Sequence, residues 1–277
     1  MSSKQIFIGI IFLCTLGSAN ARNQDTAVVK PEYIEGVVAM VEGDYSTAIT
    51  KFTPLAESGN HLAQYRLFLL YVNGWGAQKN LEVAAKWVKL SAEQGNADAQ
   101  LALGRLYDKG MGVSADQQLS NYWIEQSADG GNAEAQYIFA LDLLAKDMQS
   151  KSNVDNALIW LKSSADQGYV SAQSLLGLMY LQLGSHDPGE AIKWLKLASA
   201  EGDLEAQYNL GVAFAVGKGV LQDNRYAHMW LNIAGASGYE KARVDLQKLQ
   251  QQMTPEDISG AQELARECIR KKLKGCS

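Results

Sequence analysis

The stretch ADAQLALGRLYDKGMGV, residues Ala97–Val113, contains a dipeptide that the rest of the chain repeats at regular intervals. Five Ala-Gln pairs recur in a regular register along the chain, at Ala63-Gln64, Ala99-Gln100, Ala135-Gln136, Ala172-Gln173 and Ala206-Gln207. Successive pairs are 36, 36, 37 and 34 residues apart. Self-similarity at such a period is typical of a solenoid, in which each repeat stacks on its neighbours.

Two other residue types keep the same register along the chain. The recurring tryptophans are Trp87, Trp123, Trp160, Trp194 and Trp230, and the recurring glycines are Gly95, Gly131, Gly168, Gly202 and Gly238. We predict two helices in each unit. The first helix begins at Ala-Gln and ends at a glycine-rich turn, and the second carries the tryptophan. The recurring glycine then suits the left-handed conformation that ends many helices.

The spacing also predicts which face of the first helix is buried. At about 100° per residue, the fourth and eighth residues after each Ala share its face. These residues are Leu67 and Tyr71, Leu103 and Tyr107, Phe139 and Leu143, Leu176 and Tyr180, and Leu210 and Phe214. The fifth residue is small in four units: Gly104, Ala140, Gly177 and Gly211. Because a glycine inside a helix costs about 1 kcal/mol relative to alanine, we expect a neighbouring helix backbone to approach closely there.

These patterns predict an all-α fold, an α/α superhelical solenoid of about six helix-hairpin repeats with a C-terminal capping helix. The pattern Ala-Gln-x-x-Leu-Gly-x-x-Tyr, a Gly-x-Gly turn, Ala-x-x-Trp and a closing Ala-x-x-Gly resembles the Sel-one-like repeat, a relative of the tetratricopeptide repeat. The resemblance covers roughly residues 32–244 and implies an adaptor for other proteins, often in bacterial envelopes. The segment AKDMQSKSNVDN lacks the Gly-x-Gly turn, so we expect a different connection there.

The N-terminus has the layout of a secretory signal peptide, with one lysine, an apolar run from Ile6 to Leu16 and small residues up to Ala21. That run is much shorter than the ~20 residues that span a bilayer. We therefore predict cleavage near Ala21, export to the periplasm or beyond the cell, and no transmembrane segment in the mature chain. An uncleaved anchor is the alternative.

The predicted domains follow from these boundaries. They are the signal peptide (1–21), a short linker (22–31), a tetratricopeptide-like N-terminal capping hairpin (32–60), the Sel-one-like repeats (61–253), and a C-terminal capping helix and tail (254–277).

Two cysteines remain once Cys14 leaves with the predicted signal peptide. We predict that Cys268 and Cys276 form a disulfide, because exported proteins meet oxidising conditions. In a continuous helix they would lie ~12 Å apart, too far to bond, and a chain reversal at Gly275 is the expected way to close this gap. The basic residues of this segment, Arg270, Lys271, Lys272 and Lys274, suit the C-terminal end of a helix. The alternative is a basic patch that meets anionic lipid or glycan.

No residue pattern points to catalysis. A formal net charge of -5 offers no basic footprint for nucleic acid. His61, His186 and His228 lie in different units without metal-ligand spacing. The chain has no Gly-x-Ser-x-Gly, Ser-x-x-Lys or phosphate-loop motif. We therefore predict a protein that is not an enzyme and that holds no cofactor or metal.

Binding of a partner is the sharper hypothesis. The second, sixth and ninth residues after each Ala point away from the core stripe, and twelve of these fifteen are apolar or tyrosine. The candidate partner-binding residues are Tyr65, Leu69, Leu101, Arg105, Asp108, Tyr137, Leu141, Leu178, Tyr208 and Val212. Arg105 and Asp108 are the polar members of this set. The alternative is that this face packs against adjoining first helices.

We therefore predict a scaffold that binds other proteins or peptides of the bacterial envelope on the concave face of the solenoid. One alternative is a peptidoglycan binder or an accessory of a cell-wall hydrolase. Another is a purely structural envelope component without a saturable partner.

Overall fold

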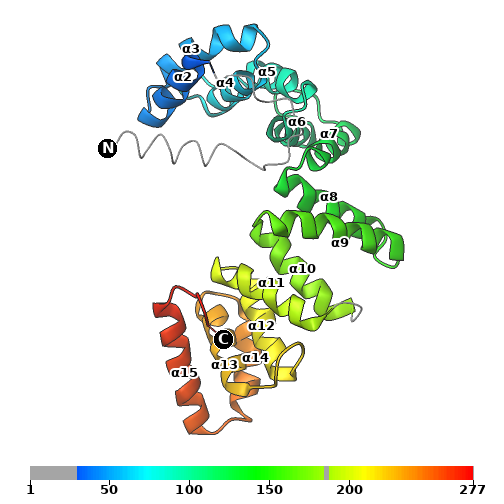
Figure 1. Cartoon of the computed structure of the whole chain (residues 1–277), viewed down its shortest axis with the longest axis vertical. Helices are drawn as coiled ribbons and strands as arrows, with labels where there is room; N and C mark the ends of the chain where they lie inside the picture. The colour runs from blue at the N-terminus through cyan, green and yellow to red at the C-terminus, as the bar shows by residue number, and fades with distance from the viewer. Residues whose placement is uncertain (1–29, 184–186, 277) are drawn as a thin grey trace. The chain divides into compact units, whose positions relative to one another are not determined.

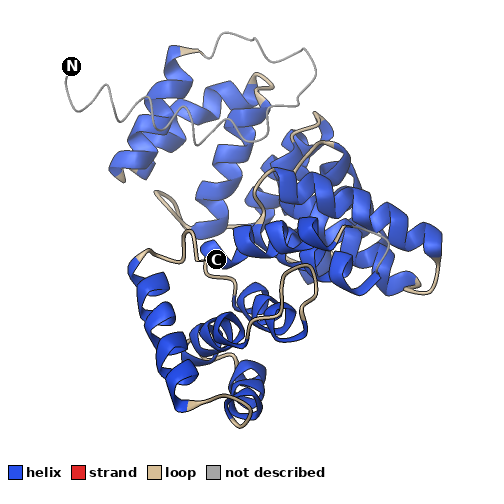
Figure 2. Ribbon diagram, turned by 60° about the horizontal axis from the view of Figure 1, so that its bottom comes forward, coloured by secondary structure: helices blue, strands red, loops and turns tan. Residues whose placement is uncertain are grey.

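A computed structural model describes residues 30–183 and 187–276. All regular secondary structure in these two ranges is helical (Figure 1 and Figure 2), which confirms the predicted all-α class. The predicted signal peptide, most of the predicted linker and His186 lie outside the described residues. Within the described ranges, no helix has the length and hydrophobicity that crossing a bilayer requires.

The helices follow one another in pairs (Figure 1). The first hairpin is α2 (Pro31–Glu42) and α3 (Tyr45–Glu57). The repeats are α4 (His61–Asn73) with α5 (Leu81–Glu93), α6 (Ala97–Lys109) with α7 (Gln117–Asp129), α8 (Ala133–Lys146) with α9 (Lys151–Asp166), α10 (Val170–Leu183) with α11 (Pro188–Ala200), and α12 (Leu204–Val216) with α13 (Asn224–Ala236). Helices α14 (Glu240–Gln250) and α15 (Pro255–Arg270) follow. The chain divides into two compact units, unit 1 (Met1–Asp142) and unit 2 (Leu143–Ser277).

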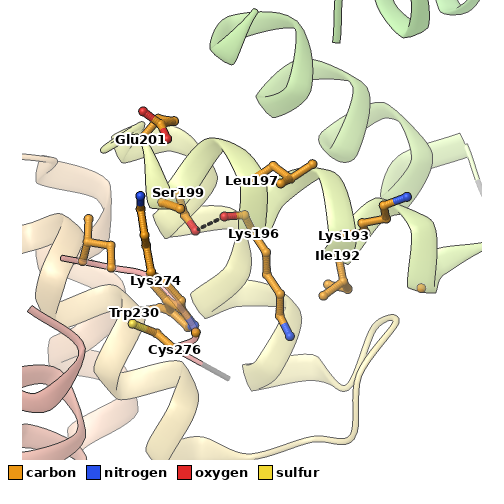
Figure 3. Close-up of a pocket in the computed structure, with 13 residues that line it drawn as sticks. Ile192, Lys193, Lys196, Leu197, Ser199, Glu201, Trp230, Lys274 and Cys276 are labelled. Atoms are coloured by element: carbon orange, nitrogen blue, oxygen red, sulfur yellow. Dashed lines mark hydrogen bonds between the residues drawn. The ribbon is translucent and has the colours of Figure 1, made fainter. Parts of the chain in front are cut away.

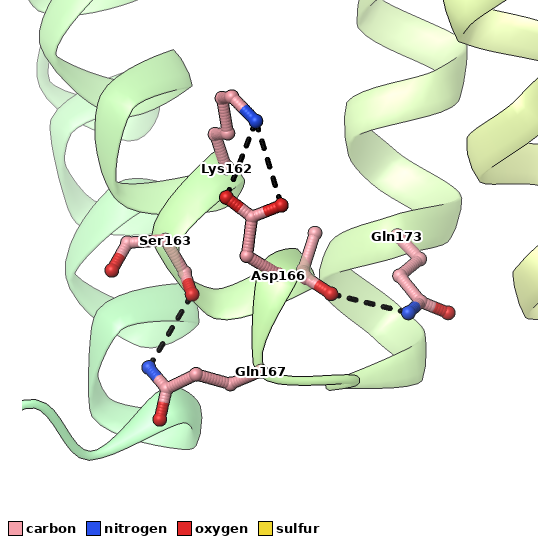
Figure 4. A network of polar contacts seen from close by, with 6 residues as sticks. Lys162, Ser163, Asp166, Gln167 and Gln173 are labelled. Atoms are coloured by element: carbon pink, nitrogen blue, oxygen red, sulfur yellow. Dashed lines mark hydrogen bonds and ion pairs between the residues drawn. The ribbon is translucent and has the colours of Figure 1, made fainter. Parts of the chain in front are cut away.

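The recurring Ala-Gln pair joins each first helix to the second helix before it. All five alanines are fully buried. Each glutamine donates its side-chain amide to the main-chain oxygen eight residues earlier, which belongs to the last turn of the preceding helix. The acceptors are Ala56, Ala92, Ala128, Ala165 and Ser199, at 3.0, 3.2, 3.2, 3.1 and 3.4 Å. Figure 4 shows Gln173 making this contact beside Asp166. The last four carbonyls of a helix lack hydrogen-bond donors within the helix. The glutamine of the next repeat supplies a donor to one of these carbonyls.

The small fifth residue of the first helix gives room to the second helix of the same repeat. A Cβ atom built on Gly211 would lie 2.8 Å from Cγ of Leu231 in α13, and one built on Gly177 would lie 2.7 Å from Cγ of Leu195 in α11. Neither distance leaves room for a methyl group. Main-chain atoms are also close, with O of Ala191 3.0 Å from the Cβ built on Gly177 and N of Leu231 3.2 Å from that built on Gly211, so the expected approach of a neighbouring helix backbone is confirmed.

The predicted core stripe is buried at six of its ten positions, including Tyr180 and Phe214, whereas Tyr71, Tyr107, Phe139 and Leu143 are only half-buried. The fourth-position residues Leu67, Leu103, Leu176 and Leu210 are all fully buried. At the segment that lacks a Gly-x-Gly turn, the second helix is longer: α9 has 16 residues, whereas α5 and α7 have 13 each. Ser150 caps its N-terminus, with its Oγ accepting from the main-chain N–H of Asn153. The connection therefore differs there, as expected.

The C-terminal helix packs on the second helix of the last repeat. Thr254 caps α15 by accepting from the main-chain N–H of Asp257 at 3.2 Å, and α15 contacts α13. Its buried face includes Ala261, Ala265 and Cys268. Ile269, the residue after Cys268, is 56% exposed.

Candidate partner-binding surfaces

Tyr65 on α4 is held by an aromatic neighbour on its own helix. It is half-buried, and its ring stacks on Phe68 with centroids 5.7 Å apart. Burial raises the pKa of Tyr65 to about 12, and the negative charge of Asp98 on α6 adds to this shift. The phenol is therefore neutral across the physiological pH range and presents a hydroxyl group beside an apolar ring.

The two polar candidates on α6 already have partners. Arg105 forms an ion pair with Glu134 of α8, the first helix of the next repeat. Asp108 lies 2.9 Å from the ammonium nitrogen of Lys109. The Arg105 side chain is 49% exposed, and an ion pair at such exposure contributes only ~0–1 kcal/mol. A carboxylate of a binding partner can therefore replace Glu134 at little cost.

Two second-position residues, Leu101 and Tyr208, are largely occupied within the fold. Leu101 is buried, at 5% exposure, so its side chain offers almost no surface to a partner. Tyr208 donates a hydrogen bond to Asp245 of α14 at 2.9 Å, and its ring lies 5.2 Å from that of Tyr239. Burial, followed by this hydrogen bond, raises the pKa of Tyr208 to about 12. Packing between first helices therefore accounts for part of the candidate face.

The sixth-position residues are more open. Leu141 is 38% exposed, and Arg105 has the half-exposed side chain described above. Leu69, Leu178 and Val212 are half-buried, as is Tyr137 at the second position. The candidate residues from Tyr65 to Leu141 belong to unit 1, whereas Leu178, Tyr208 and Val212 belong to unit 2.

A pocket that the sequence patterns did not predict lies in unit 2, on the second helices. It is lined by α11, by Trp230 of α13 and by the tail from Leu273 to Cys276, and its volume is about 590 Å³ (Figure 3). The only hint in the sequence was the basic C-terminal segment. Apart from that segment, the sequence predicts only a solvated surface on the exposed side of the second helices.

The tail reaches this pocket because the chain reverses after α15. Lys272 and Leu273 have positive φ angles of 53° and 64°. The sulfur atoms of Cys268 and Cys276 lie 2.09 Å apart, with Cα atoms 5.3 Å apart. The reversal begins at Lys272, three residues before the predicted site at Gly275, which also has a positive φ angle of 68°.

Among the described residues, no group of three or more His, Cys, Asp and Glu side chains is placed to hold a metal ion. His228 is buried, with 1% exposure, and its Nε2 lies 2.9 Å from Nε2 of Gln250. Burial lowers the pKa of His228. The side chain therefore stays neutral inside the helical core.

The repeat register matches a known family. A sequence model of the Sel1 repeat matches residues 61–96, 97–132, 133–169, 170–203 and 204–239. This chain belongs to the Sel1 repeat family. The matched segments coincide with the five helix pairs from α4–α5 to α12–α13. Helices α2, α3, α14 and α15 lie outside them.

Solved structures of Sel1 repeat proteins share the fold. A Sel1 repeat protein from Oxalobacter formigenes is 28% identical, with a TM-score of 0.68 over 85% of this chain and 97% of that chain. The protective antigen c5321 of uropathogenic Escherichia coli, which displays an SLR fold, is 25% identical, with a TM-score of 0.53 over 88% of this chain and 69% of that chain. The predicted α/α solenoid of helix pairs is thereby confirmed.

A curated relative shares only part of its length with this Sel1 repeat protein. The DAP3-binding cell death enhancer 1 of Mus musculus is 33% identical over 95 residues, which are 34% of this chain. The match spans 19% of the length of that relative. The similarity to this relative is therefore limited to a short segment and does not extend to the whole of either protein.

Proposed function

We propose that this Sel1 repeat protein is a non-enzymatic scaffold that binds other proteins of the bacterial envelope through its first-helix face. Sel1 repeat proteins generally mediate protein–protein interaction. The first-helix face is defined here as the sixth-position residues Leu69, Arg105 and Leu141 of unit 1, together with Tyr65 beside them. These residues lie on the successive first helices α4, α6 and α8.

The observation that carries this proposal is the contrast between held and exposed side chains on that face. Tyr65 stacks on Phe68, so its ring is held before a partner arrives, whereas Arg105 pairs with Glu134 only through an exposed ion pair. Leu141 remains 38% exposed. A side chain held in advance loses less conformational entropy on binding, and the exposed leucine offers a partner apolar area to bury.

Export is part of the proposal, because the N-terminal layout favours a signal peptide. The test is the N-terminal sequence of the protein isolated from the cells that produce it. We expect it to begin at Arg22, and we expect Ala21→Arg to block cleavage. An intact Met1 N-terminus on protein that remains in the cytoplasm would contradict export.

The partner surface is tested by site-specific photo-crosslinking in the same cells. A photo-reactive amino acid replaces Leu141 on α8 or, as the control, Leu119 on α7. The two leucines are 38% and 39% exposed. They are therefore almost equally accessible, but one lies on a first helix and the other on a second helix. We expect a protein cross-linked from position 141 and absent from position 119, whose yield falls when Leu69→Glu is added.

Two results would contradict this scaffold function. Equal cross-linking from both positions would mean that the first-helix face has no preferred partner. Capture of glycan strands alone, with hydrolysis of peptidoglycan in the purified sample, would favour the cell-wall alternative.

A further inference from the structure

The pocket of unit 2 combines an apolar floor with basic edges. Ile192 and Trp230 are buried in its floor, at 5% and 1% exposure. Leu197 lies at the pocket and is 43% exposed. A volume of about 590 Å³ lies within the range of roughly 300–1,000 Å³ that is typical of ligand sites. The pocket can therefore take one bulky side chain and the main chain on either side of it.

The charges around the pocket are mostly positive, although the chain as a whole carries a net charge of -5. Its lining includes Lys193, Lys196 and Lys274 but only one carboxylate, that of Glu201. In the described part of the chain, none of these three lysines forms an ion pair with a carboxylate. Local charge of this kind attracts an acidic partner.

The lysines surround the pocket instead of converging in it. Figure 3 shows the ammonium groups of Lys193, Lys196 and Lys274 pointing away from one another, with Trp230 and Cys276 beside Lys274. A single anionic group in the floor would meet apolar side chains. Acidic groups placed on both sides of an apolar residue would instead meet Lys193 and Lys196 on α11 and Lys274 on the tail.

The floor also contains a polar group without a partner. The indole Nε1–H of Trp230 is buried and has no hydrogen-bond acceptor among the described residues. An unpaired buried donor is costly to the folded state. This nitrogen is covered by protein atoms, so it lies beneath the surface that a ligand would meet.

We propose that this pocket binds an acidic peptide segment of a partner protein, with one apolar residue flanked on both sides by aspartate or glutamate. The apolar residue covers Ile192 and Trp230, and the flanking carboxylates approach the three lysines. The tail wall is linked to α15 through the Cys268–Cys276 contact, so the site is ordered before binding. It lies on the second helices and is independent of the first-helix face.

The test measures the dissociation constant of a fluorescein-labelled peptide, Glu-Asp-Phe-Asp-Glu, by anisotropy with the full mature chain. Peptides of sequence Glu-Asp-Gly-Asp-Glu and Lys-Lys-Phe-Lys-Lys are the ligand controls. We expect each control peptide to bind at least tenfold more weakly than the probe. We also expect the affinity for the probe to fall as salt rises, because the rim charges are exposed and screened by ions.

Matched variants locate the site. Lys196→Glu/Lys274→Glu should weaken binding at least tenfold, whereas Lys151→Glu/Lys241→Glu, which changes the net charge equally, should leave it within twofold. Leu197→Ser should weaken binding at least threefold. Leu183→Ser should not, although Leu183 is also 43% exposed. Circular dichroism confirms that each variant is folded.

Three results would overturn the proposal. The first is equal binding by the two charge-reversal variants. The second is equal affinity for the peptides with phenylalanine and with glycine. The third is binding of phosphatidylglycerol vesicles, lost in Lys196→Glu/Lys274→Glu, without binding of the acidic peptide. Cross-linking from Leu141 is unaffected by all these variants if the first-helix scaffold function is correct, so the two proposals fail separately.

Discussion

The side-chain Nε2 of Gln64 donates to the main-chain oxygen of Ala56 at 3.0 Å, and its Oε1 accepts from Nε2 of Gln94 at 2.7 Å. Both ends of this buried amide are therefore bonded. Gln100, in the same slot of the next repeat, donates to Ala92, but its Oε1 is buried without a partner in the described structure. The same residue type therefore contributes differently to the stability of two repeats.

We predict that Gln64→Ala destabilises the protein more than Gln100→Ala does. Gln64→Ala removes two hydrogen bonds, each worth about 1 kcal/mol. Gln100→Ala removes one bond and also an unsatisfied buried oxygen, so the loss is partly offset. The measurement is the free energy of unfolding in urea, followed by circular dichroism. The control is Gln118→Ala, an exposed residue of α7, for which we expect no change. A larger loss of unfolding free energy in Gln100→Ala would show that the hydrogen bond to the side-chain oxygen does not decide the difference between the two variants.

Gly211→Ala should destabilise the chain even though alanine is the better helix former. The added Cβ would lie 2.8 Å from Cγ of Leu231, and relieving such a contact costs about 1–3 kcal/mol. That exceeds the gain of about 1 kcal/mol in helix propensity. Gly189→Ala in α11 is the control, because the nearest atom to its Cβ is Oδ1 of Asp187 at 3.3 Å. Thermal unfolding compares the two, and equal stability would contradict the close approach.

Stability should decrease below neutral pH because of His228. Burial lowers the pKa of His228, so the unfolded state, with a pKa of ~6.5, binds a proton that the folded state excludes. This contribution is fully present above the unfolded pKa and is lost as the pH falls through that value. His228→Gln should therefore reduce the difference in urea midpoint between pH 7.5 and pH 5.5. An unchanged difference would assign the pH dependence to other groups.

The Cys268–Cys276 pair should be oxidised in the mature protein. We expect a maleimide to label no cysteine of the denatured but unreduced mature chain, and to label two after reduction. Cys276→Ser should speed amide exchange from Leu273 onward, because the tail is then no longer tied to α15. The expected loss of stability is at most about 2–3 kcal/mol, since the closed loop is short. Two labelled thiols before reduction would show that the bond is absent.

Much of the fold was predictable because it depends on local spacing. A residue that is fully buried in each unit, such as Ala99 or Ala206, recurs at the repeat period and is visible in the sequence. The close approach at Gly211 was predictable for the same reason, because only a packing constraint explains a glycine within a helix.

The candidate site was less predictable. Helical periodicity places Leu101 and Leu141 on similar faces of their helices, yet one is 5% and the other 38% exposed. Their exposure depends on which neighbouring helix covers them. Arg105 was interpreted as an open polar group, but it pairs with Glu134 of the next first helix. Spacing within one helix carries no information about such contacts between helices.

The sequence by itself determined the helix pairs, their period and the membership of the Sel1 repeat family, because these follow from which residues recur at fixed intervals. The tertiary structure decided that each recurring glutamine bonds to a carbonyl eight residues earlier and that the tail joins α11 and Trp230 in one pocket. The physical reason is distance. A repeat pattern encodes the order of residues along a helix, whereas a hydrogen bond or a pocket wall requires atoms of separate segments to meet within a few ångströms.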